Sequence, residues 1–149
     1  MIDGYGRDIN YLRLSVTDLC NLKCCYCMPA KGIAKKEHSQ ILRLETFERI
    51  AREAVGLGFT KIRVTGGEPL VRRGILELIK GIASLKKQGL KELTLTTNGV
   101  LLSKYAEDLK RAGLTRVNIS LDSLDPVKYK EITRGGDLQK VLEGIKAAQ

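Results

Sequence analysis

The chain has 149 residues, 43% of them hydrophobic and 29% charged, and a net charge of +9. This length suits one domain with one core, and no apolar run is long enough for a signal peptide or a membrane span, so a cytoplasmic protein without a membrane is expected. The basic excess fits a phosphorylated ligand or nucleic acid. Nucleic acid is the weaker option, because aromatic residues are only 5% and Trp is absent.

Strands and helices are predicted to alternate along the chain. Alternating apolar and polar residues predict strands at 11–17, 61–65, 93–97 and 116–121. Apolar residues at helical spacing and capping residues predict helices near 46–57, from 75 to 89, from Ser103 to 113, after Asp125-Pro126, and after Asp137. This order predicts an α/β fold with a parallel sheet.

The predicted strands are polar at every second residue, whereas parallel strands covered on both faces are usually apolar throughout. Helices should therefore cover the apolar face, while the polar face lines a concave interior. Barrels of this kind form their sites at the carboxyl ends of the strands. The fold expected is a partial TIM-type (βα) barrel, and a sheet with one solvated face is the alternative.

All four cysteines lie in one short stretch, and three of them, Cys20, Cys24 and Cys27, have the spacing C-x3-C-x2-C. Cysteines this dense in a chain without a secretory signal indicate a metal or redox site. Three thiolates suit a [4Fe–4S] cluster with one iron left open. Zinc would need a fourth ligand, Cys25 or His38, and a redox pair of Cys24 and Cys27 would leave Cys20 unexplained. We interpret Cys25 as a packed neighbour.

Arg13 and Arg63 fall on the polar face of neighbouring predicted strands, which would place them side by side in the interior. Two like charges at that distance need a shared anion, and arginine binds phosphate with two parallel hydrogen bonds. A polyphosphate between them is expected. An ion pair with an acidic side chain is the alternative.

The cysteine spacing, the aromatic residue before its last cysteine, and the Gly-Gly-Glu-Pro segment 66–69 together resemble the radical S-adenosylmethionine (radical SAM) superfamily. Segments 11–20, 63–72, 96–99 and 118–124 resemble its GTP-cyclising family of molybdenum cofactor biosynthesis. The resemblance implies a [4Fe–4S] cluster and S-adenosyl-L-methionine as cofactors. It implies cluster ligands Cys20, Cys24 and Cys27; S-adenosylmethionine contacts Tyr26, Gly67, Ser120 and Glu68; and GTP contacts Arg13, Arg63 and Thr96.

The resemblance also implies a lyase that converts GTP to (8S)-3′,8-cyclo-7,8-dihydroguanosine 5′-triphosphate through a 5′-deoxyadenosyl radical. The partners implied are GTP, an electron donor of the flavodoxin or ferredoxin type and a cyclic pyranopterin monophosphate synthase acting downstream, with a homodimer left open. Two alternatives stand beside this function. They are another radical SAM enzyme that modifies a peptide or cofactor, and a basic metal-site module that binds nucleic acid.

Members of the resembled family are longer and end in a domain with a second cluster on three further cysteines, which residues 1–149 lack. We therefore expect one domain here, the amino-terminal portion of the radical SAM core, with about four of the six βα units of such a barrel. Without the remaining units, the chain alone is expected not to complete the reaction.

Overall fold

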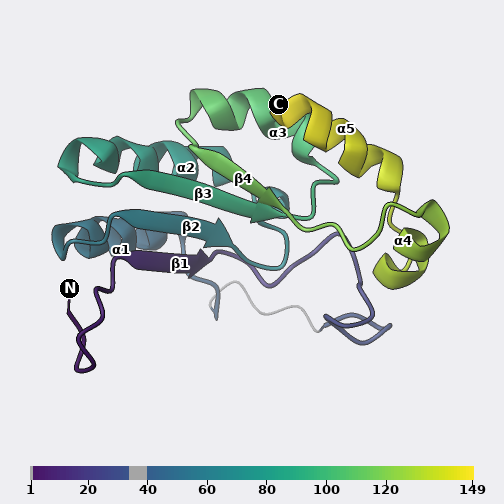
Figure 1. The fold of residues 1–149 in the computed structure, drawn as a ribbon, viewed down its shortest axis with the longest axis horizontal. Helices are drawn as coiled ribbons and strands as arrows, with labels where there is room; N and C mark the ends of the chain where they lie inside the picture. Colours follow the sequence, from purple (N-terminus) through teal and green to yellow (C-terminus); the bar gives the residue numbers. More distant parts are fainter. Residues whose placement is uncertain (1, 34–39) are drawn as a thin grey trace.

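The computed structural model describes residues 2–33 and 40–149. Four parallel strands form one sheet in the order β1-β2-β3-β4 (Figure 1). Their bounds are β1 Tyr11–Ser15, β2 Lys61–Thr65, β3 Glu92–Thr97 and β4 Arg116–Ile119. Sequential strands are neighbours and helices connect them, so the predicted α/β fold with parallel βα units is confirmed. His38, the alternative zinc ligand, lies outside the described residues.

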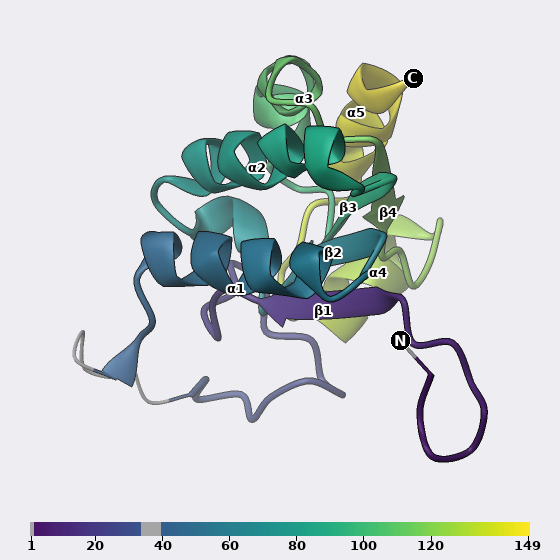
Figure 2. The same cartoon turned by 90° about the vertical axis from the view of Figure 1, so that its left-hand side faces the viewer.

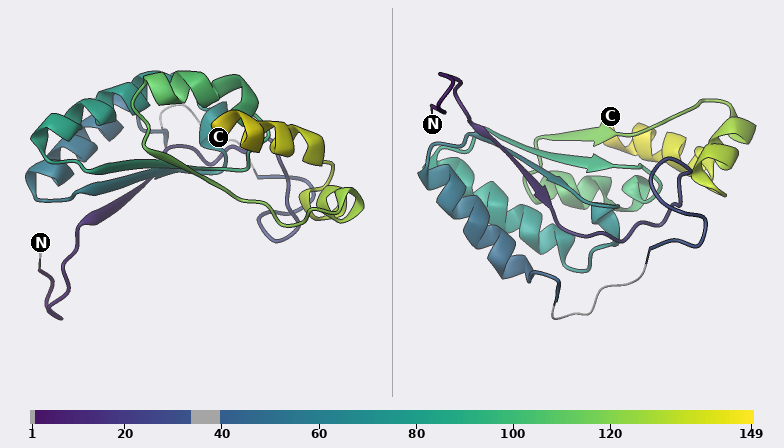
Figure 3. Two further views of the ribbon diagram at one scale, coloured as in Figure 1. Left: turned by 45° about the horizontal axis from the view of Figure 1, so that its top comes forward. Right: turned by 90° about the horizontal axis from the view of Figure 1, so that it is seen from below.

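The α-helices described are α1 Leu44–Gly56, α2 Ile75–Ser84, α3 Leu102–Arg111, α4 Pro126–Thr133 and α5 Leu138–Ala148, and short 3-10 turns occur at η2 Pro69–Val71 and η3 Leu85–Gln88. Helices α1, α2, α3 and α5 cover one face of the sheet, and none of the helices in the described part of the chain covers the other face (Figures 2 and 3). The partial barrel expected from the sequence therefore carries this helix layer on the apolar face of its sheet.

The core lies between this helix layer and the apolar face of the sheet. Ile62, Val64, Leu93 and Leu95 on the central strands are all at most 1% exposed, and α2 covers them with residues such as Ile79. These side chains occupy every second strand position, which is why an alternating sequence produces one dry face and one polar face. Burial of this apolar surface is the main driving force for the packing of the helices.

Two of the predicted helix caps are present and one is wrong. The Asp125 carboxylate accepts bonds from the backbone of the first turn of α4, and Asp137 does the same at α5. Ser103 does not cap α3, which begins one residue earlier at Leu102. The cause is a turn at Gly99, where φ is 81° and the carbonyl accepts a bond from Leu102 N–H.

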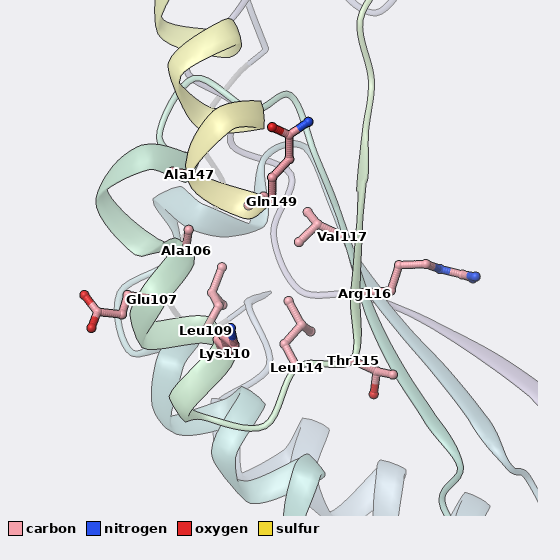
Figure 4. A pocket seen from close by; sticks show the side chains of 11 residues that line it. Ala106, Glu107, Leu109, Lys110, Leu114, Thr115, Arg116, Val117, Ala147 and Gln149 are labelled. Atoms are coloured by element: carbon pink, nitrogen blue, oxygen red, sulfur yellow. The ribbon is translucent and has the colours of Figure 1, made fainter.

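The two outer strands are shorter than predicted, since β1 ends at Ser15 and β4 at Ile119. Past these ends the backbone still forms single bonds, from Val16 to Thr65 and from Ser120 to Thr97. A pocket of 390 Å³ lies between α3, β4 and the end of α5, and none of the predicted site residues is among the residues that line it (Figure 4). Within the described residues, no helix is both long and apolar enough to cross a membrane.

Candidate functional site

The carboxyl ends of the four strands lie at one edge of the sheet, as parallel pairing requires (Figure 1). Four chain segments leave this edge. They are the cysteine loop (residues 16–33), the glycine segment (66–69), the Asn98-Gly99 turn and residues 120–123. The fold therefore gathers the predicted cluster, cofactor and turn motifs, which are up to a hundred residues apart in sequence, at one end of the molecule.

Contacts with the end of α4 hold the cysteine loop. The Cys25 backbone N–H donates to the Ile132 carbonyl at 2.8 Å. The Arg134 guanidinium donates to the carbonyls of Lys23 at 3.0 Å and Met28 at 2.7 Å. Arg134 adopts a left-handed backbone with φ of 53°, which is uncommon for a residue other than glycine. The loop is thus fastened from its outer side by an element a hundred residues further along the chain.

The cysteines of the loop differ in exposure. Cys20 and Cys24 are half-buried, whereas Cys25 and Cys27 are exposed. Burial raises the pKa of the Cys20 and Cys24 thiols, and the charge of Cys27 raises both pKa values further. The three sulfurs of the predicted ligand set are therefore within electrostatic reach of one another, and their protons must leave when a cation binds.

Within the described residues, the three thiols are not gathered around a single point. In the described part of the chain, no three His, Cys, Asp or Glu side chains are close enough to hold a single ion. An iron–sulfur cubane binds each thiolate through a different iron, so its ligands need not meet at one point. A donor set of three thiols from one largely exposed loop fits a cluster of that kind.

The glycine segment packs directly on the start of the cysteine loop. A Cβ atom at Gly66 would lie 2.5 Å from the Thr17 carbonyl oxygen, and one at Gly67 would lie 2.3 Å from that of Leu19. Gly67 N–H donates to Thr17 at 2.7 Å, and Glu68 N–H donates to Leu19 at 2.8 Å. The glycines are therefore required by the chain's own backbone, in addition to any ligand.

Glu68 is fully buried, at 0% exposure. Its carboxylate accepts bonds from Leu70 N–H at 3.0 Å, the Thr97 hydroxyl at 2.8 Å and Asn98 N–H at 2.7 Å. Burial raises the pKa of this carboxyl, while the three bonds oppose that rise. Glu68, which was predicted to contact S-adenosylmethionine, thus links the segments that follow β2 and β3.

The predicted substrate residues lie on the polar face. Arg13 and Arg63 are direct partners in the β1–β2 register, so the expected pair is present. Within residues 2–33 and 40–149, neither forms an ion pair with a carboxylate. Arg63 lies over the Tyr11 ring at 5.4 Å. Its Nε, like the hydroxyl of Thr96, is buried and has no hydrogen-bond partner among the residues that the structure describes. Arg13 is exposed instead of buried, because β1 is an edge strand.

The remaining predicted residues, Tyr26 and Ser120, are placed by the segment that follows β4. The Tyr26 hydroxyl donates to both carboxylate oxygens of Asp122 at 3.0 Å. Ser120, two residues earlier, is exposed at the same strand end. Asp122 was not singled out from the sequence as a site residue. Its position in the polar alternation of the fourth strand was the signal that could have identified it.

Sequence reasoning also missed Asn98, Arg134 and Tyr129. Asn98 continues the polar alternation of β3 and was detectable, whereas no local pattern distinguishes Arg134. Tyr129 is 1% exposed and its hydroxyl has no hydrogen-bond partner in the described structure. Burial and the nearby Cys24 raise the pKa of Tyr129 to about 12.

Comparisons with known proteins agree with this arrangement. Residues 14–149 match the model of the radical SAM superfamily. The chain is 62% identical over 145 residues to a GTP 3′,8-cyclase of Alkaliphilus oremlandii, and 62% identical over 149 residues to one of Peptoclostridium acidaminophilum. These alignments cover 97% and 100% of the chain, but it spans only 45% of the length of either relative.

Solved structures share the fold. HydG, a maturase of the [FeFe]-hydrogenase, superposes with a TM-score of 0.69 at 18% identity over 93% of this chain and 32% of its own. Streptococcus suis SuiB bound to S-adenosylmethionine gives a TM-score of 0.64 at 23% identity, covering 93% of this chain and 30% of its own. The family match spans nearly all of the sheet, the helix layer and the cysteine loop, and the chain belongs to the radical SAM superfamily.

Proposed function

We propose that this chain forms the cofactor-binding part of a radical SAM enzyme that converts GTP to (8S)-3′,8-cyclo-7,8-dihydroguanosine 5′-triphosphate in molybdenum cofactor biosynthesis. The names of its relatives support this substrate, and the chain covers 45% of their length. The observation that carries the proposal is the Arg13–Arg63 pair, two arginines that are direct partners in the register of β1 and β2.

A [4Fe–4S] cluster and S-adenosylmethionine are the proposed cofactors. Cys20, Cys24 and Cys27 would hold the cluster, and the loop contacts with α4 would orient them. Bound there, the cluster and S-adenosylmethionine supply a one-electron cleavage that yields a 5′-deoxyadenosyl radical. Such a reaction needs an external one-electron donor, for which we propose a flavodoxin or ferredoxin.

The residues proposed to contact S-adenosylmethionine come from three different strand ends. Tyr26 reaches across to Asp122, Gly67 brings its backbone to the edge of the sheet, and Ser120 lies exposed there. Glu68 would act on the cofactor through the backbone that it fixes, since its carboxylate already accepts three bonds.

The polar face is proposed to bind the triphosphate of GTP. The buried Nε of Arg63 and the buried hydroxyl of Thr96 have no hydrogen-bond partner within residues 2–33 and 40–149, and a buried polar group without a partner costs about 1–3 kcal/mol. An anion with several acceptor oxygens would satisfy Arg63, and an acceptor on the same ligand would satisfy Thr96.

A cyclic pyranopterin monophosphate synthase would then use the product.

Binding measurements test this proposal without requiring turnover. GTP and guanosine affinities are measured by equilibrium dialysis on the unsubstituted chain and on Arg13→Ala and Arg63→Ala. Hydrogen bonds to charged groups contribute about 1.5–3 kcal/mol each, so GTP should bind at least tenfold more tightly, and either substitution should remove most of that preference.

A matched control is Arg52→Ala, which removes an exposed guanidinium on α1 that pairs with Glu48. It should leave the preference for GTP unchanged. Equal affinity for guanosine and GTP would contradict the triphosphate assignment. Radical chemistry with a peptide or another cofactor would then be the better reading of the same cysteine loop.

A further inference from the structure

Asn98, the first residue after β3, connects the strand edge to a proposed cluster ligand. Its side-chain Nδ2 donates to the Asn21 side-chain oxygen at 2.8 Å and lies 3.7 Å from the Cys20 sulfur. The amide oxygen of Asn98 accepts a bond from Val100 N–H at 3.0 Å. Because the oxygen is engaged with the turn, the NH₂ group is the end that faces the cysteine loop.

The position of Asn98 is fixed from behind by the buried carboxylate of Glu68. One carboxylate oxygen accepts Asn98 N–H at 2.7 Å, and the other accepts the Thr97 hydroxyl at 2.8 Å. Since Glu68 is 0% exposed, water does not compete for these bonds. The backbone at Asn98 is therefore fixed by the fold before any ligand binds, and the Val100 N–H holds the side-chain oxygen.

The Cys20 sulfur receives a second N–H group, from the backbone of Leu22 at 3.4 Å. Hydrogen bonds to ligand sulfurs stabilise negative charge and are one of the factors that set the reduction potential of an iron–sulfur cluster. Reduction adds an electron to the cluster, so donors directed at its thiolates favour the reduced form.

We propose that Asn98 is a positioning residue that orients Cys20 and, by donating to its sulfur, raises the reduction potential of the cluster bound there. This inference rests on the proposed cluster site. In this role Asn98 affects how readily the cluster accepts an electron, and it does not contact the substrate or S-adenosylmethionine.

The test is a spectroelectrochemical titration of the reconstituted chain with Asn98→Ala and Asn98→Ser. Serine retains an oxygen that can accept from Val100 N–H, but it is too short to reach Cys20. For both variants we expect the equilibrium constant of reduction to fall by up to about tenfold, a negative shift of up to about 59 mV for a one-electron couple.

Asn10→Ala is the matched control, because the Asn10 amide donates to Asp8 at 3.0 Å at the opposite end of the sheet. Its potential should equal that of the unsubstituted chain. An unchanged potential in Asn98→Ser, with iron content and circular dichroism retained, would overturn the inference while leaving the cluster site intact. If the unsubstituted chain bound no cluster, the proposed function and this inference would both be wrong.

Discussion

The cysteine loop and the glycine segment are neighbours at the same sheet edge, yet they are built in opposite ways. The cysteine loop is long and largely exposed, and contacts with the end of α4 fasten it from outside. The glycine segment is short, and its Glu68 is fully buried with a carboxylate that accepts three hydrogen bonds. Reactive groups thus lie on the less stabilised segment, and the buried one supplies the rigid base against which they are placed.

Removal of single cysteines should give the largest effect in this comparison. Cys20→Ala, Cys24→Ala and Cys27→Ala should each abolish the broad charge-transfer absorption of the anaerobically reconstituted chain, because each removes one thiolate from the set of three. Cys25→Ala is the control and should retain the absorption, since only its backbone is bound to Ile132. Loss of the absorption in Cys25→Ala would overturn the ligand assignment.

On the buried side, Glu68→Ala should lower the free energy of unfolding by about 3 kcal/mol or more, because it leaves three donors without their acceptor, two of them buried, and opens a cavity. Urea denaturation followed by circular dichroism measures this loss. Glu53→Ala, an exposed glutamate on α1, should change stability by no more than about 0.5 kcal/mol. If the two substitutions cost the same, Glu68 would not be the base of the site.

On the exposed side, Arg134→Asn should loosen the cysteine loop while the rest of the fold stays intact. Asparagine tolerates the left-handed backbone but cannot reach the Lys23 and Met28 carbonyls. The free energy that holds the loop against α4 should therefore fall by about 1 kcal/mol. Limited trypsin digestion should cut faster after Lys23 or Lys31. Arg111→Asn on α3 serves as a control, and equal rates in the two variants would show that α4 does not hold the loop.

The smallest effect concerns pH. Burial raises the pKa of Glu68 above its ordinary value of 4.5, so the unfolded chain loses this proton at lower pH than the folded one. The contribution of Glu68 to stability is therefore full below pH 4.5 and falls as pH rises from there to the folded pKa. Glutamine does not titrate, so in Glu68→Gln the free energy of unfolding should lack this fall between pH 4.5 and the folded pKa of Glu68. An identical pH slope in both proteins would contradict the direction of the shift.

Much of the fold was predictable, because local chemistry decides it. Alternation with period two identified the four strands and assigned Ile62 and Val64 to the dry face, where they are 1% and 0% exposed. Asp125 and Asp137 marked helix starts, since each carboxylate can accept bonds from its own first turn. The same reasoning failed at Ser103, because the turn at Gly99 fixes the start of α3 earlier than a side-chain cap would.

The sequence by itself determined the composition of the site: the cysteine spacing and the glycine segment each follow from residues within a few positions of one another, and strand alternation assigned Arg13 and Arg63 to the polar face. Only the tertiary structure decided how these parts are held. The bonds from Glu68 to Asn98, from Asn98 to Cys20 and from Arg134 to Met28 join residues 30, 78 and 106 positions apart. No local pattern encodes such contacts, because they depend on which strand ends become neighbours once the helices have packed on the sheet.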